Sequence, residues 1–151
     1  MTTNSQKSLR QTALRMLSRR DYSREDISQK LKEKGFHLSD IQVILEDAVA
    51  EGWLNDTRFT ENYIRARRAK GYGPVRIQQE LRSKGIAQET IADHLKITDN
   101  SWLAEIQRLW QKHFQGKKAD SPVSRAKQMR FLQYRGFTSE QVYTLFNDDD
   151  L

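Results

Sequence analysis

The sequence has 151 residues, of which 36% are hydrophobic and 30% charged, with a formal net charge of +6 and no cysteine. This composition excludes disulfides, zinc–thiolate sites and cysteine nucleophiles, and it favours several small modules over one large hydrophobic core. No apolar run approaches the ~20 residues that span a bilayer, and the N-terminal stretch lacks the apolar segment of a signal peptide, so we expect a cytoplasmic protein without a membrane partner.

Apolar residues recur at helical spacing along the chain, and good helix formers dominate the sequence. Runs of β-branched residues are absent, which argues against strands. The pattern predicts an all-α fold of about nine short helices. In chain order, their apolar stripes lie at residues 9–17, 27–31, 41–49, 59–66, 77–81, 91–95, 103–114, 129–132 and 142–146.

The predicted helices have recognisable starts. Ser23 with Asp26, and Thr138 with Gln141, have the spacing of capping boxes. An Asn-Asp pair at 55–56 can cap the fourth helix, and Gly-Pro at 73–74 places a proline at the first position of the fifth. The stretch 116–124, rich in Gly, Lys, Ser and Pro, is typical of a loop.

Three glycines reveal an internal repeat, because Gly35, Gly85 and Gly136 lie 50 and then 51 residues apart. Each follows a leucine four positions earlier and a basic residue one position earlier, and each precedes an apolar residue. Matching apolar stripes lie on both sides, which a common helix ending would not explain. We therefore predict three tandem three-helix repeats forming an elongated, curved body, with boundaries at 1–54, 55–98 and 99–151.

Charge is distributed unevenly along the chain. Residues 58–85 carry eight basic and two acidic groups, and residues 117–135 carry six basic and one acidic group. Residues 1–57 are neutral, with nine groups of each sign. Two basic segments on a neutral-to-acidic background are typical of a protein that binds a polyanion, although many charge runs are only solvated surface.

The first basic segment places arginines around a turn. Several basic residues end one predicted helix, Tyr72 lies in the turn, and Arg76 begins the next helix. We expect the helix that starts at Pro74 to leave backbone N–H groups free for a phosphate or a carboxylate. The candidate DNA- or filament-binding residues here are Arg58, Arg65, Arg67, Arg68, Lys70, Tyr72, Arg76 and Lys84.

The second basic segment combines charge with aromatic residues. Phe131 and Tyr134 are placed to stack on bases, although packing of Phe131 into the helix core is slightly favoured. We expect the tryptophans at 53, 102 and 110 to be packing anchors between modules. The candidate binding residues in this segment are Lys117, Lys118, Arg125, Lys127, Arg130 and Arg135.

Catalytic patterns are missing from the sequence. His37, His94 and His113 lie in different repeats and lack the spacing of metal ligands, so surface or packing roles are favoured for them. There is no phosphate-binding GxxxxGK[ST] motif, and Asp148 to Asp150 have the composition of an acidic tail. We predict no catalytic residue, no cofactor and no metal, and hence a protein that is not an enzyme.

Four segments resemble the RecX family of regulatory proteins. They are GWLNDTRF at 52–59, KGYGPVRI at 70–77, the stretch from Glu80 to Ile86, and RFLQYRGF at 130–137. Asn55 stands where the family more often has aspartate. The resemblance implies three tandem three-helix repeats in a bacterial protein that modulates the RecA recombinase.

The resemblance also implies a function and partners. Such a regulator, mainly an inhibitor, binds the RecA filament and the single- or double-stranded DNA within it, and blocks extension, strand exchange and ATP hydrolysis. We expect it to act as a monomer. The alternative is a stand-alone DNA-binding protein of the helix-turn-helix type, for which Arg76, Gln78 and Gln79 come closest to a base-reading set.

Overall fold

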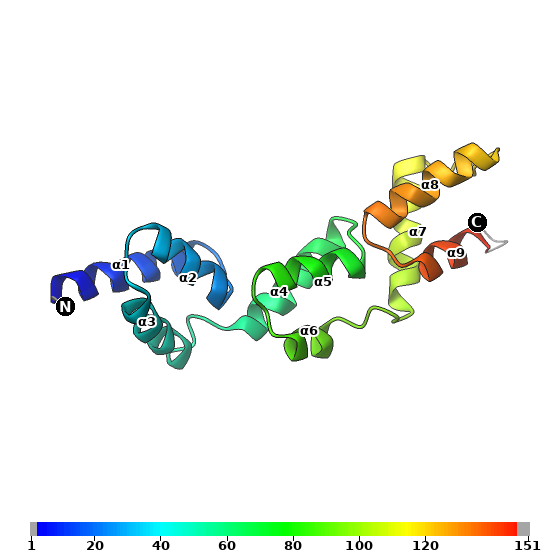
Figure 1. The fold of residues 1–151 in the computed structure, drawn as a ribbon. Coiled ribbons are helices and arrows are strands. Elements are labelled where there is room, and N and C mark those ends of the chain that lie inside the picture. Colours follow the sequence, from blue (N-terminus) through cyan, green and yellow to red (C-terminus); the bar gives the residue numbers. More distant parts are fainter. Residues whose placement is uncertain (1–2, 148–151) are drawn as a thin grey trace. The chain divides into compact units, whose positions relative to one another are not determined.

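The computed structural model describes residues 3–147 and is shown in Figure 1. This part of the chain contains nine α-helices and no strand, which confirms the all-α prediction. None of its helices is long and apolar enough to cross a membrane. The helices are α1 (Thr3–Arg19), α2 (Arg24–Glu33), α3 (Leu38–Ala50), α4 (Asp56–Ala69), α5 (Pro74–Ser83), α6 (Gln88–His94), α7 (Ser101–Phe114), α8 (Pro122–Tyr134) and α9 (Ser139–Phe146).

Side-chain caps fix the starts of several helices. The Ser23 hydroxyl accepts a hydrogen bond from Asp26 N at 3.1 Å, and Asn55 Oδ1 accepts one from Arg58 N at 3.0 Å. Thr138 and Gln141 form a reciprocal capping box at the start of α9. These bonds satisfy backbone donors that a helix leaves unpaired at its first turn. The cap at Asn55 and the capping box at Thr138 are therefore confirmed, whereas Ser23 caps α2 without the reciprocal bond of a capping box, because the Asp26 carboxylate pairs with Lys84.

The chain divides into two compact units, whose border passes through the second repeat. The first unit comprises residues 1–62 and 81–90, and the second comprises residues 63–80 and 91–151. In the first unit α1, α2 and α3 pack against one another around a small apolar core. The buried residues of this core are Leu9, Ala13, Ile27, Leu31, Ile41, Leu45, Ala48 and Leu54.

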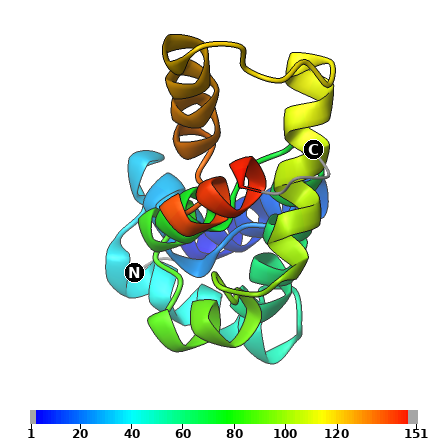
Figure 2. The same cartoon turned by 90° about the vertical axis from the view of Figure 1, so that its right-hand side faces the viewer.

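The second unit is built around two buried tryptophans of α7. Trp102 packs edge-on against Phe137, and Trp110 donates its indole N–H to Gln128 at 3.0 Å. The Gln128 amide in turn donates to Lys117 O at 3.1 Å, so this buried polar pair is satisfied. Helix α9 packs against both α7 and α8, as Figure 2 shows.

The sequence predicts packing anchors between modules at all three tryptophans, but only two of them are packing anchors, and their partners Phe137 and Gln128 belong to the same third repeat. Trp102 and Trp110 are almost completely buried, whereas Trp53 remains 39% exposed. The guanidinium of Arg10 lies 5.7 Å from the Trp53 ring, so that ring contacts a charged surface side chain. The prediction that Trp53 is a packing anchor is therefore wrong.

Two of the repeat glycines, Gly85 and Gly136, lie at joints between consecutive middle helices. Ser23 at the start of α2 donates its hydroxyl to Lys84 O at 2.7 Å, beside Gly85. At the equivalent place in the second unit, Gly73 N donates to Arg135 O, and Val75 N donates to Gly136 O, both at 2.8 Å. In each case the N-terminus of one middle helix meets the C-terminal end of the next.

Candidate nucleic-acid interface

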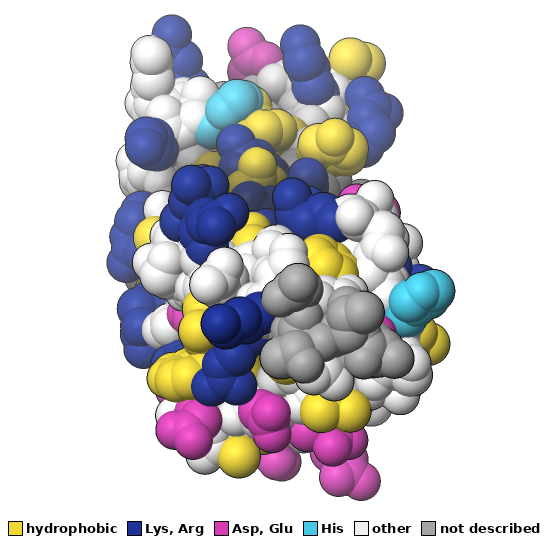
Figure 3. Space-filling model, turned by 90° about the vertical axis from the view of Figure 1, so that its left-hand side faces the viewer, with side chains coloured by type: hydrophobic (Ala, Val, Ile, Leu, Met, Phe, Trp, Pro, Cys, Tyr) yellow, Lys and Arg dark blue, Asp and Glu magenta, His cyan; other side chains and the backbone are white. Residues whose placement is uncertain are grey.

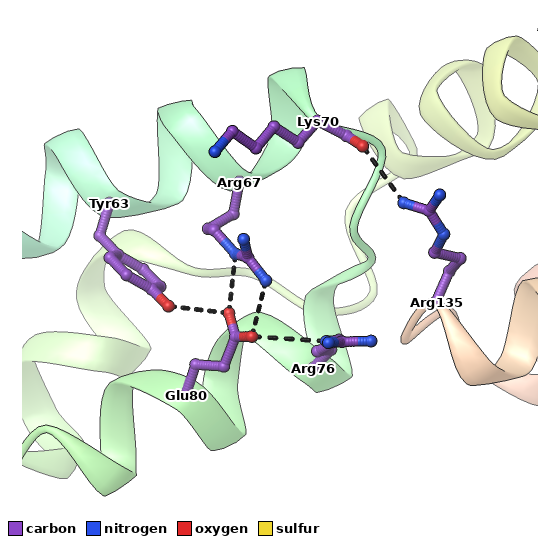
Figure 4. A network of polar contacts seen from close by, with 6 residues as sticks. All are labelled: Tyr63, Arg67, Lys70, Arg76, Glu80 and Arg135. Atoms are coloured by element: carbon purple, nitrogen blue, oxygen red, sulfur yellow. Dashed lines mark hydrogen bonds and ion pairs between the residues drawn. The ribbon is translucent and has the colours of Figure 1, made fainter.

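A network around the Glu80 carboxylate forms the centre of the first basic segment (Figure 4). Helix α4 presents Tyr63 and Arg67, four residues apart, and α5 presents Arg76 and Glu80 at the same spacing, so each pair shares one helix face. Arg67 donates Nε and Nη2 to the two carboxylate oxygens at 2.9 and 2.8 Å. Tyr63 donates its hydroxyl at 2.9 Å, and Arg76 Nε lies 3.4 Å away. One carboxylate thus holds two arginines and a tyrosine.

This network shifts the ionisation of its members. Burial alone would raise the pKa of Glu80, but hydrogen bonds from Arg67 and Tyr63 and the nearby positive charges outweigh it, so the pKa falls below its ordinary value. Burial, with the hydrogen bond to Glu80, raises the pKa of Tyr63 to about 12. Near neutral pH the Glu80 carboxylate is therefore charged and the Tyr63 phenol is protonated. Because Arg67 and Arg76 both form ion pairs with Glu80, part of the positive charge of this segment is neutralised within the protein.

Three guanidinium groups surround the ring of Tyr72. Those of Arg67, Arg76 and Arg135 lie 3.8, 4.5 and 4.9 Å from its centroid. Arg135 also donates Nη1 to Lys70 O at 3.3 Å (Figure 4). Each cation–π contact contributes about 0.5–1 kcal/mol at exposed sites and more where water is excluded. Tyr72 therefore serves to hold the arginines in place.

The N-terminus of α5 does not provide the free donors that we expected there. The N–H groups of Gly73 and Val75 are bonded to the carbonyls of Arg135 and Gly136 at 2.8 Å. A Cβ on Gly73 would lie 2.5 Å from Gly136 C and Phe137 N, so the two backbones are in direct contact. The prediction of a phosphate site on these N–H groups is wrong, because the next repeat occupies the position that the anion would take.

Family models match three consecutive parts of the chain. Family models described as the first, second and third three-helix domains of RecX match residues 10–47, 55–95 and 101–146. The chain belongs to the RecX family. This finding confirms the resemblance of the four sequence segments and the prediction of three three-helix repeats, and it makes the chain a relative of regulatory proteins.

Individual RecX relatives match over nearly the whole chain. The regulatory protein RecX of Pseudomonas entomophila (strain L48) is 37% identical over 143 residues, which are 95% of this chain and 92% of that protein. The RecX protein of Legionella pneumophila (strain Corby) is 41% identical over 137 residues, 91% of each chain. The crystal structure of RecX from Lactobacillus salivarius has the same fold, with a TM-score of 0.85, 22% identity and 99% coverage of both chains.

Two candidate residues lie in the first unit of this RecX-family chain and support its fold. Arg58 donates to the carbonyls of Gly52 and Trp53 at 3.0 and 3.1 Å and lies 3.7 Å from Asp21. Lys84 lies 3.4 Å from the Asp26 carboxylate. Both side chains have internal partners, so an external phosphate would have to compete for them.

Other candidates on α4 differ in their surroundings. The guanidinium of Arg68 lies 3.9 Å from the centroid of Trp102, donates to the Ser101 hydroxyl at 3.1 Å and lies 3.9 Å from Glu105. Arg65 is exposed on the same helix, and Lys70 is exposed in the turn just after its last residue. Arg68 is thus held by α7, whereas Lys70 makes no ion pair with any other described residue.

The second basic segment is the more accessible one. Of its candidates only Arg135 is half-buried, and the guanidinium of Arg125 lies 5.2 Å from the Phe146 ring. Phe131 stacks on His113 at 3.8 Å, so its packing role is the correct one. The exposed basic side chains of this segment with no ion pair within the described residues are those of Lys117, Lys118, Arg125, Lys127 and Arg130.

Two further basic residues, Arg108 and Lys112 of α7, line a hollow of about 90 Å³ beside Lys70 of the first basic segment. Glu105 also lines this hollow and forms an ion pair with Arg108 at 2.8 Å. Arg108 and Lys112 were missed because the segment 86–116 has a net charge of −1. Their spacing of four residues, which places them on one helix face, is the signal that could have found them.

On the face shown in Figure 3, most acidic side chains lie near the lower edge, further acidic atoms lie at the upper edge, and basic side chains are spread over the rest. Within the described chain, no group of three or more His, Asp or Glu side chains is placed to hold a metal ion. The arrangement offers guanidinium and ammonium groups, which suit phosphate oxygens and carboxylates.

Proposed function

We propose that this protein regulates the RecA recombinase, mainly as an inhibitor, by binding the RecA–DNA filament and blocking its extension, strand exchange and ATP hydrolysis. The observation that carries the proposal is the match of all three RecX domains along the chain. RecA as partner, the DNA within the filament and the monomeric state are part of the proposal. So is a cytoplasmic location, where bacterial DNA lies.

The basic side chains of the second unit support this function. Lys70, in the turn after α4, and Lys127 and Arg130, on α8, are exposed and have no carboxylate partner among the described residues. When such groups bind DNA phosphates, the DNA releases its condensed counterions. This release favours binding to a nucleoprotein filament. No catalytic residue is needed for this action, and we propose none. The candidate binding residues of both basic segments remain the proposed contacts.

The geometry argues against the helix-turn-helix alternative. A recognition helix reads bases with side chains at its N-terminus, which must enter the major groove. The N-terminus of α5 is covered by the backbone at Arg135 and Gly136. Arg76 is also tied to Glu80 and lies between two tyrosine rings. The helix with the best base-reading set is therefore blocked.

The proposal is tested by titrating the protein into RecA that hydrolyses ATP on single-stranded DNA. We expect substoichiometric protein to lower the rate of hydrolysis, because an inhibitor that blocks extension acts at filament ends. An unchanged rate at a molar excess over RecA would refute the proposed function.

Charge-reversal variants show whether the second unit carries the contact. Replacing Lys70, Lys127 and Arg130 by glutamate should raise the protein concentration needed for inhibition. The slope of log affinity against log salt concentration should also become shallower. The change is about 0.9 for each lost phosphate contact on duplex DNA and about 0.7 on single strands. The control reverses Lys30 and Lys32, which are exposed on α2 outside the candidate segments. Equal loss in both variants would assign the effect to net charge alone.

A further inference from the structure

The ring of Tyr134 is the most exposed aromatic side chain in the described part of the second unit, with 75% of its surface accessible. It lies at the C-terminal end of α8, two residues before the repeat glycine Gly136. The equivalent positions of the first two repeats hold Glu33 and Ser83, which are also exposed. The repeat therefore forms its helix end without an aromatic residue here, and the fold does not account for Tyr134.

Tyr134 is the outer end of an alternating series of arginines and tyrosines. The guanidinium of Arg67 lies 3.8 Å from the Tyr72 centroid, and that of Arg76 lies 4.5 Å from the same centroid. Arg76 also lies 5.5 Å from the centroid of Tyr134. Glu80 anchors the inner part of the series through its bonds to both arginines. The series thus presents a supported ring to the solvent.

Positive charge follows the same face of α8. Arg130 and Lys127 precede Tyr134 by four and seven residues, so all three share one side of the helix. At 1.5 Å per residue they lie about 6 and 10.5 Å from Tyr134 along the axis. Helix α8 contains no acidic residue. A ligand on the ring could therefore extend negative groups along α8 without meeting a carboxylate of that helix.

We propose that Tyr134 is a stacking platform for one unpaired nucleobase, with Arg130 and Lys127 holding the adjoining phosphates, so that the protein binds single-stranded DNA directly. A base supplies a π face for the ring, and its backbone supplies the negative charge. An acidic peptide would pair with the basic groups, but its carboxylates would not stack on the exposed ring. In a duplex the base faces are already stacked, so Tyr134 distinguishes single strands from duplex. The inference rests on the proposed function only in taking DNA as the polyanion.

The test measures binding of the full-length protein to a fluorescein-labelled oligothymidylate by fluorescence anisotropy, without RecA. Base–aromatic stacking is worth about 1–3 kcal/mol per base, which corresponds to a roughly 5- to 150-fold loss in affinity for Tyr134→Ala. Tyr134→Phe should bind within about twofold of the wild type, because the ring remains. The matched control is Tyr143→Ala on α9, a tyrosine that is 55% exposed, and it should leave affinity unchanged.

An abasic oligonucleotide of the same length separates stacking from charge. We expect the wild type and Tyr134→Ala to bind it equally, and likewise to bind a duplex equally. The inference is overturned if Tyr134→Ala binds oligothymidylate as well as the wild type does. It is also overturned if the variant loses as much affinity for the abasic strand, because the ring would then act by placing Arg76. The RecA assay is independent, so inhibition without stacking would leave the proposed function intact.

Discussion

Alanine at the three repeat glycines tests whether the joints between repeats carry stability. Gly35, Gly85 and Gly136 have φ angles of +99°, +76° and +105°, in the region that favours glycine. A side chain in a left-handed conformation costs about 1–2 kcal/mol, and this cost should be similar at all three. The surroundings differ, because an added Cβ meets nothing within 4 Å at Gly35.

The other two positions have close neighbours across the joints. A Cβ at Gly85 would lie 2.4 Å from the Cβ of Glu25, and one at Gly136 would lie 2.4 Å from the Cβ and 2.8 Å from the backbone N of Arg76. Forcing extra atoms into a packed contact costs a further 1–3 kcal/mol or so. We therefore expect a loss of about 1–2 kcal/mol for Gly35→Ala and about 2–5 kcal/mol for the other two, with Gly136→Ala the larger because backbone obstructs it.

Urea denaturation followed by circular dichroism and tryptophan fluorescence measures these losses. Gly35 and Gly85 lie in the same compact unit, so their comparison is made within one folding context. Equal losses in the free energy of unfolding at all three positions would refute the reasoning. Backbone strain alone would then explain the losses, and the joints would not contribute to stability.

Two further predictions concern polar groups with internal partners, the buried Gln128 and the half-buried Glu80. Replacing Gln128 by methionine should lower the free energy of unfolding by about 1–3 kcal/mol, because Trp110 Nε1 and Lys117 O lose their hydrogen-bond partner. The control is Gln133→Met, at an exposed position of the same helix. Equal losses of stability in the two variants would contradict the role of the hydrogen bonds. The lowered pKa of Glu80 means that its contribution to stability is complete above its unfolded value of about 4.3 and is lost as the pH falls through the folded value. As the pH falls below about 5, the wild type should therefore lose more stability than Glu80→Gln, as measured by urea denaturation at each pH, and parallel curves would refute this.

Local signals in the sequence were enough to predict the fold. Helical periodicity, caps such as Thr138 with Gln141, and the spacing of the repeat glycines depend on residues close in the chain, and the structure confirms them. The joints could not be predicted in the same way. Gly73 and Gly136 are far apart in sequence, and nothing local shows that the carbonyls at 135 and 136 take the N–H groups of α5.

The candidate site shows the same difference between composition and geometry. Charge counting found Arg67 and Arg76 but could not show that Glu80 holds both of them. It also counted Arg58, which binds carbonyls of its own turn. Net charge is a sum over a segment, whereas availability to a ligand depends on the partner of each side chain. For the basic residues of α8, charge counting and geometry agree that the helix offers them no carboxylate partner, because no acidic residue lies in it.

The lengths of the middle helices limit how this repeat array can grow. Helices α2 and α5 each have 10 residues, whereas α8 has 13 and starts about one turn earlier relative to its glycine. Ser124 is the repeat equivalent of Gly73, but its N–H is already bonded to Ser121 Oγ at 3.0 Å inside α8. A fourth module could not attach there by the same joint. The space beside Gly35 is open, whereas the start of the preceding middle helix occupies that space at Gly85 and Gly136. A module grafted before the first repeat could therefore place its middle helix against Gly35.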